Sequence, residues 1–209
     1  MSKPANGYFL FVLALSFVAA PLQAADPVIV LLKTSKGDIK LELNQELAPR
    51  TVENFVKYVN DGYYEGVIFH RIMADFMIQT GGFVDKAKAE INEHKKGLRE
   101  PIKNESDNGL SNTRYTIAMA RTRVANSATS QFFINTKDNV QTLDRKYCAD
   151  GVGYCVFGKV IEGKDVVDAI KSVAVTASRT GEPSVPKEHI TIEKAMIVEI
   201  KKSEEGKKD

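Results

Sequence analysis

Residues 67–83 read VIFHRIMADFMIQTGGF, and this stretch decides how we interpret the rest of the chain. It is rich in large apolar side chains, with one guanidinium, one imidazole and one carboxamide among them. Because side chains alternate along a strand, a strand here points Arg71 to the same side as Phe69 and His70 to the opposite side. The charged group has two explanations: it serves a site, or it belongs to a core hairpin whose arginine reaches solvent.

A second strand is expected from Phe76 to Gln79, after the Ala74-Asp75 pair breaks the apolar run. This strand ends at Thr80-Gly81-Gly82, where backbone freedom allows a turn or the close approach of another segment. Two such strands bring four candidate side chains close together: Arg71, Phe76, Met77 and Gln79.

The N-terminus has the pattern of a secretory signal peptide, which we assign to residues 1–25. One charged residue, Lys3, precedes an apolar run over 8–20, and cleavage is expected after Ala24 or Ala25. An uncleaved N-terminal anchor is the alternative. The apolar run is shorter than the roughly 20 residues of a membrane span, so we expect no membrane insertion after processing.

The rest of the chain is expected to form one domain over residues 26–200, followed by a charged tail over 201–209. The sequence has 209 residues, with 29 Lys and Arg against 27 Asp and Glu, and a formal net charge of +2. Such a balance gives no reason to expect a nucleic-acid partner.

Periodicity predicts the first elements of this domain. Residues 28–34 and 38–43 are rich in strand-forming side chains, and the turn residues 35–37 between them predict a β-hairpin. Pro49 suits the first turn of a helix. Apolar residues follow it at helical spacing, at Val52, Phe55, Val56 and Val59.

A second amphipathic helix is predicted near residues 165–173. Short apolar runs occupy most of the remainder, at 115–120, 131–134, 154–160 and 189–200. Many short strands, two helices and frequent turns predict a mainly β fold, a closed antiparallel barrel with helices over its ends.

Five motifs, in order along the chain, resemble those of the cyclophilin family of peptidyl-prolyl cis-trans isomerases: Phe69-His70-Arg71-Ile72, Phe76-Met77-Ile78-Gln79, Met119-Ala120, Ser130-Gln131-Phe132-Phe133-Ile134 and Val156-Phe157-Gly158-Lys159-Val160. The resemblance covers nearly all of residues 28–200. Together with the signal peptide, it resembles most the periplasmic cyclophilins of Gram-negative bacteria. It implies a closed eight-stranded antiparallel barrel capped by two α-helices, with the proline site on its outer surface. A periplasmic monomer that needs no cofactor is expected.

The resemblance also assigns roles to residues. Arg71 matches the catalytic arginine, and His70 matches a histidine at the edge of the groove. The walls of the proline pocket match Phe76, Met77, Phe133 and Leu143, and the pocket floor matches Tyr154. The groove that holds peptide backbone matches Gln79, Ala120, Arg121 and Gln131. Because adjacent strand residues face opposite ways, Phe132 is expected in the core if Phe133 lines the pocket.

The chain departs from the family pattern at four places. Ala74-Asp75 replaces the usual Pro-Gly of the turn, and Thr142 replaces an aromatic residue beside the pocket leucine. Tyr154 stands where a histidine is often found on the pocket floor, as in other bacterial members, and Arg121 replaces an asparagine. The drug cyclosporin uses that aromatic residue, so the resemblance implies weak inhibition. These changes are expected to tune the choice of substrate.

Rotation about the bond before proline is slow because amide resonance must be broken, at a cost of about 18–20 kcal/mol. In the twisted state the nitrogen accepts hydrogen bonds, and the permanently protonated guanidinium of Arg71 can donate to it. The predicted function is therefore cis–trans isomerisation of Xaa-Pro bonds in exported proteins, which assists their folding. The alternative is a chaperone module that binds proline-containing clients with little turnover.

The histidines and cysteines are considered separately. The histidines, His70, His94 and His189, lack paired ligand spacing, so no metal site is predicted. Cys148 and Cys155 are the only cysteines, and export to an oxidising compartment predicts a disulfide between them, worth on the order of 2 kcal/mol. Two free thiols, with Cys155 packed as a small apolar residue, are the alternative.

Overall fold

The computed structural model describes residues 27–84 and 93–198. The predicted signal peptide and charged tail therefore lie outside the described residues. The helices are α1 (Pro49–Asn60), α2 (Val140–Leu143) and α3 (Lys164–Lys171). The strands are β1 (Val28–Thr34), β2 (Gly37–Leu43), β3 (Val67–Ile68), β4 (Arg71–Met73), β5 (Met77–Thr80), β6 (Phe83–Val84), β7 (Glu93–His94), β8 (Thr116–Met119), β9 (Phe132–Asn135), β10 (Val156–Glu162), β11 (Val175–Ala177), β12 (Pro183–Pro186) and β13 (Thr191–Val198). No helix in these ranges is both long enough and apolar enough to cross a membrane.

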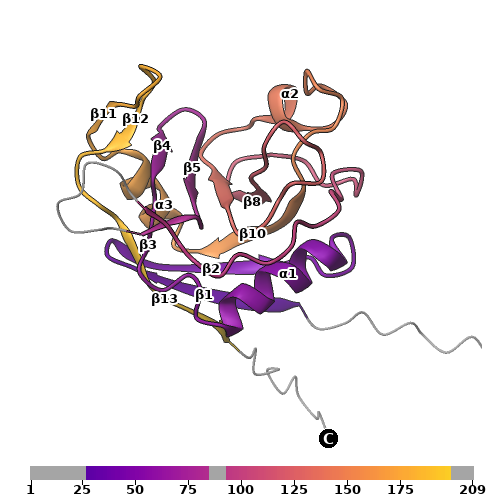
Figure 1. Cartoon of the computed structure of the whole chain (residues 1–209), viewed down its shortest axis with the longest axis horizontal. Coiled ribbons are helices and arrows are strands. Elements are labelled where there is room, and N and C mark those ends of the chain that lie inside the picture. Colours follow the sequence, from indigo (N-terminus) through magenta and orange to yellow (C-terminus); the bar gives the residue numbers. More distant parts are fainter. Residues whose placement is uncertain (1–26, 85–92, 199–209) are drawn as a thin grey trace, which may run out of the picture.

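One antiparallel sheet dominates the described part of the chain. It contains eleven strands, in the order β4-β5-β9-β8-β10-β2-β1-β13-β3-β6-β7. β11 and β12 form a separate hairpin that lies against β4, near the top of the molecule in Figure 1. The predicted mainly β, antiparallel fold class is confirmed. The strand count differs from the predicted eight because irregular residues divide the chain into shorter strands, some of only two residues.

Residues 67–73 connect two distant parts of this strand order. β3 pairs with β13, whereas β4, two residues further on, pairs with β5 at the opposite end. Between these strands the Phe69 N–H donates to the Ile190 carbonyl at 2.9 Å, and the His70 N–H donates to the Gln79 carbonyl at 3.1 Å. The sheet is therefore strongly curved, with this segment bridging its two sides.

The change of partner at residues 69–70 interrupts the alternation of side chains. Phe69 and Ile72 both lie in the main core, although a regular strand would place them on opposite faces. The prediction that Arg71 points the same way as Phe69 is wrong, because Phe69 is fully buried and the Arg71 side chain is one-third exposed. A local break thus brings the arginine to the surface.

The predicted N-terminal hairpin is confirmed as β1 and β2, which pair from Val28 opposite Leu43 to Thr34 opposite Gly37. β1 also pairs with β13, so that Ile29 lies opposite Val198. The two ends of the described chain are therefore neighbours. In Figure 1 they lie at the lower edge of the molecule, away from β4, β5 and α2.

The first predicted helix is confirmed as α1, which begins at Pro49. Its buried apolar side chains stand at the predicted helical spacing: Val52, Phe55 and Val59. The Phe55 ring packs with its centroid 5.2 Å from each of three other buried rings, those of Tyr64, Phe132 and Phe157. Burying a ring of this size contributes about 1.5–3 kcal/mol, so this aromatic cluster anchors the helix to the sheet.

The second predicted helix is confirmed as α3, which buries Val167 and Ile170. The sequence did not predict α2 or the β11–β12 hairpin. Both are too short to show a periodic pattern, at four residues for α2 and three and four for the strands. Both contribute residues near the candidate site.

Candidate active site

Nine side chains line a cavity of about 120 Å³: Arg71, Phe76, Met77, Gln79, Ala120, Arg121, Phe133, Leu143 and Tyr154. They come from β4, β5, β9 and α2, from the turn between β4 and β5, and from the segments that follow β8 and precede β10. All nine were named from the sequence. The remaining two predicted residues, His70 and Gln131, lie next to this group without lining the cavity.

The apolar wall of the cavity follows from strand alternation. Gln79 of β5 lies opposite Phe133 of β9. The neighbours of these two residues along the strands point the other way, into the main core: Ile78, Phe132 and Ile134. Phe133 instead joins a separate buried cluster with Met77, Ala118, Leu143 and Val156. The predicted division of the phenylalanine pair, with Phe132 in the core and Phe133 at the pocket, is confirmed.

A carboxamide pair borders the polar side of the cavity. Gln79 Nε2 donates to Gln131 Oε1 at 2.9 Å. The contact needs the backbone after β5 to pass close to residues 130–131: Gly81 has φ of +92°, and a Cβ there would meet the Ser130 carbonyl oxygen at 2.5 Å. The predicted close approach at the glycine pair is confirmed, and it sets the distance between the two carboxamides.

Arg71 lies directly opposite Gln79 in the β4–β5 ladder. Its Nε donates to Oε2 of Glu182 at 2.7 Å, and its Nη2 donates to Oε1 at 2.8 Å. Hydrogen bonding from Arg71 lowers the pKa of the Glu182 carboxyl. The guanidinium carbon is 6.0 Å from the centre of the Phe76 ring, at the cavity edge. The cation therefore stands between an apolar wall and an acidic partner.

Arg121 builds part of the cavity instead of reaching freely into it. Its side chain is only 2% exposed. Nε donates to the Gly153 carbonyl at 3.0 Å, Nη2 pairs with Asp150 at 2.5 Å, and the guanidinium lies 4.4 Å from the centre of the Tyr154 ring. The pKa of the Asp150 carboxyl lies well below its usual range, mainly because the Val152 N–H donates to it and, to a smaller extent, because Arg121 does. These contacts fix the floor residue Tyr154.

His70 lies near the cavity, with its ring centroid 4.5 Å from that of Phe83. Its backbone N–H bonds to the Gln79 carbonyl, which places the imidazole beside the strand that carries the carboxamide. The predicted position at the edge of the groove agrees with this placement.

Both cysteines lie within the described residues and are free thiols, so the predicted disulfide is not formed. Cys155 is buried in the main core with its sulfur 3.4 Å from Oγ1 of Thr51, and burial raises the pKa of its thiol to about 11. Cys148 lies in the loop after α2 and is partly buried. The two side chains thus have different surroundings, one in the core and one at the loop.

Two partners in this region were not predicted. Glu182 is 111 positions from Arg71 and precedes a strand too short to be recognised. Asp150 stands before Gly151, a pair that signals a turn but not a partner. Neither carried a pattern in the sequence that connects it with the cavity.

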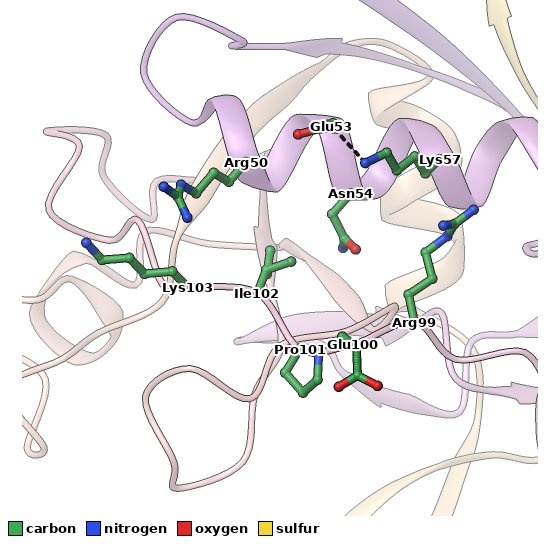
Figure 2. A pocket seen from close by; sticks show the side chains of 9 residues that line it. All are labelled: Arg50, Glu53, Asn54, Lys57, Arg99, Glu100, Pro101, Ile102 and Lys103. Carbon is green, nitrogen blue, oxygen red and sulfur yellow. Dashed lines mark hydrogen bonds and ion pairs between the residues drawn. The ribbon is translucent and has the colours of Figure 1, made fainter.

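A larger cavity, of about 480 Å³, lies between α1 and the segment 99–103. Figure 2 shows its lining, which is mostly charged: Arg50, Glu53, Asn54, Lys57, Arg99, Glu100, Pro101, Ile102 and Lys103. The dashed line in Figure 2 marks the ion pair between Lys57 and Glu53, at 2.5 Å. This space has no continuous apolar wall for a proline ring, and it contains none of the residues predicted for the site.

Comparisons with known proteins identify the family of the chain. The family described as cyclophilin type peptidyl-prolyl cis-trans isomerase/CLD matches residues 29–197. A peptidyl-prolyl cis-trans isomerase of Streptomyces antibioticus is 52% identical over 167 residues, 80% of this chain and 96% of that protein. Isomerase B of Escherichia coli is 47% identical over 166 residues, 79% of this chain and 97% of that protein. Isomerase A of Dickeya dadantii is 44% identical over 198 residues, 95% of this chain and 99% of that protein.

Solved structures show the same architecture. A crystal structure of a cyclophilin type isomerase from Cryptosporidium parvum matches with a TM-score of 0.63 and 25% identity, over 84% of this chain and 99% of that chain. The structure of that isomerase in the presence of the dipeptide Ala-Pro matches with a TM-score of 0.64 and 25% identity, over 82% and 99% of the two chains. The chain therefore belongs to the cyclophilin family, and it is a peptidyl-prolyl cis-trans isomerase related to those of bacteria.

Proposed function

We propose that Arg71 is the catalytic residue of this isomerase, and that the enzyme acts as a periplasmic monomer on Xaa-Pro bonds of exported proteins during their folding. The observation that carries the proposal is the cavity of about 120 Å³ with Arg71 at its edge and Phe133 in its apolar wall.

The cavity suits a reaction that needs no covalent step. Met77, Phe133 and Leu143 are at most 5% exposed and present apolar surface to the pyrrolidine ring. When the prolyl bond twists, its nitrogen gains a free lone pair and accepts a hydrogen bond from Arg71. An interaction present only in the twisted state lowers the barrier without tightening the binding of the planar substrate.

One donor is not sufficient for the whole effect. A million-fold acceleration needs roughly 8 kcal/mol, whereas one preorganised donor supplies about 3–4. The apolar wall contributes by holding the ring while the preceding carbonyl rotates.

Export is supported by the sequence at the N-terminus. Residues 1–25 have the charged start, apolar run and small residues of a signal peptide.

Exchange NMR of an Xaa-Pro peptide tests the catalytic role. We expect the processed protein to give fast cis–trans exchange and Arg71→Ala to reduce the rate by about 10²–10³-fold, the usual effect of removing one preorganised donor. Arg50→Ala, an arginine of the charged cavity in Figure 2, serves as the matched control and is expected to retain the rate of the parent. If the parent binds the peptide without accelerating exchange, a chaperone module becomes the better interpretation.

N-terminal sequencing of the protein from a periplasmic fraction tests the location. A start at Ala25 or Asp26 is expected, because cleavage follows Ala24 or Ala25. A start at Met1 in a membrane fraction would instead indicate an uncleaved anchor.

A further inference from the structure

The guanidinium of Arg71 is already bound along one edge. A guanidinium has five N–H donors in a rigid plane. Two of them bond to Glu182, and Nη2 also contacts the sulfur of Met73 at 3.2 Å. Among the described residues, the two donors of Nη1 have no partner, while Arg71 lines the cavity. The contacts thus leave the Nη1 edge available for a ligand.

The β11–β12 hairpin holds Glu182 in place. The Ser178 N–H donates to the Glu182 carbonyl at 2.7 Å, and the Gly181 N–H donates to the Ser178 carbonyl at 2.9 Å. Pro183, the next residue, begins β12, which packs against the strand that carries Arg71. The Ser184 hydroxyl also donates to the Glu182 backbone carbonyl, at 3.5 Å. The carboxylate therefore projects from a closed turn whose position relative to β4 is fixed.

We propose that Glu182 is a positioning residue, whose carboxylate holds the guanidinium of Arg71 in one orientation and so presents Nη1 to the nitrogen of the twisted prolyl bond. The inference rests on the catalytic role proposed above for Arg71. A two-bond fork between a carboxylate and a guanidinium fixes the plane as well as the direction of the group. The donor is then in place before the bond twists.

The same contact also has an opposing effect, because the negative charge of the carboxylate weakens the positive electrostatic potential of Arg71 in the cavity. The exposure of the pair indicates which effect is larger. Arg71 and Glu182 are 33% and 32% exposed, so water screens the charge of the carboxylate. The constraint that two hydrogen bonds impose on direction is still present. Removal of the carboxylate is therefore expected to slow the reaction.

Peptide exchange in variants of Glu182 tests the proposal, with kcat and KM measured separately. Glu182→Ala is expected to lower kcat by about three- to tenfold at unchanged KM. This is the size of effect expected when one long side chain, here that of Arg71, is no longer held in a single conformation. Glu182→Gln keeps one acceptor oxygen and is expected to fall between Glu182→Ala and the parent. Glu188→Ala is the matched control, since Glu188 forms an ion pair with Lys36 at 2.9 Å outside the cavity. This variant should equal the parent.

The same substitution in the Arg71→Ala background separates positioning from a general effect on the structure. If Glu182 acts through the guanidinium, Glu182→Ala changes nothing further in that background. An unchanged or increased kcat in Glu182→Ala alone, or an equal loss in both backgrounds, overturns the proposal. Failure of the catalytic role has a different signature: Arg71→Ala then keeps the rate of the parent, and the positioning proposal falls with it.

Discussion

Phe132 and Phe133 are adjacent and equal in size but lie in different environments. Phe132 is fully buried in the main core, whereas Phe133 lines the cavity. Phe133→Leu is therefore expected to raise KM for an Xaa-Pro peptide by about tenfold, the factor typical of a lost contact in an apolar pocket. Phe132→Leu is expected to leave KM unchanged and to lower the free energy of unfolding by about 1–3 kcal/mol. Peptide kinetics and urea unfolding measure the two effects, and an equal change of KM in both variants would contradict this division.

At the scale of residues, the sequence predicted the cavity lining well, because strand alternation and the family motifs both depend on residues that are close together in the sequence. Met77, Gln79 and Phe133 all line the cavity as expected. It could not predict Glu182, because the fork with Arg71 depends on a hairpin 111 positions away. The disulfide prediction failed for a related reason: redox compartment and spacing do not reveal that Cys155 packs into the core.

Among the elements, the turn after β5 is the one whose geometry most directly supports the groove. Gly81 and Gly97 have the same φ of +92°, but an added Cβ meets the Ser130 carbonyl at 2.5 Å only at Gly81 and nothing within 4 Å at Gly97. Gly97→Ala is expected to cost about 1–2 kcal/mol, the strain of an L side chain at positive φ. Gly81→Ala is expected to cost about 1–3 kcal/mol more, because the clash is with backbone.

Gly81→Ala is also expected to raise KM, because displacing residues 130–131 separates Gln131 from Gln79. Denaturant unfolding and peptide kinetics of both alanine variants provide the measurement. Equal costs for the two substitutions would show that conformational strain alone accounts for the glycine at position 81.

The elements that the sequence predicted either have a repeating pattern or lie in short apolar runs, as β8, β9, β10 and β13 do. The β1–β2 hairpin, α1 and α3 have such patterns over seven or more residues, and all three are present. At residues 69–70 the pattern misled us, because the chain changes partner from β13 to β5 without any change in composition. Long-range pairing decides such a break, and a local window of sequence does not contain it.

For the molecule as a whole, carboxylates with lowered pKa predict loss of stability in acid. Hydrogen bonding from Arg71 lowers the pKa of Glu182. Hydrogen bonds from the Val152 N–H and, second in size, from Arg121 lower the pKa of Asp150. Groups whose pKa is depressed on folding stabilise the protein above their ordinary pKa, and this contribution is lost as they protonate. The urea midpoint is therefore expected to be nearly constant near neutral pH and to fall progressively below about pH 5. A midpoint that rises on acidification would contradict the assignment of these partners.

The pairing of β1 with β13 has a consequence for rearranging the chain. Ile29 and Val198 are partners across two antiparallel strands, so a linker of a few glycine and serine residues can connect the two ends of the domain. New termini could then be opened at Gly97, in a run of exposed residues away from the cavity. The result is a circular permutant in which every group that lines the cavity keeps its neighbours, because continuity of the chain between 28 and 198 is not what holds the groove together.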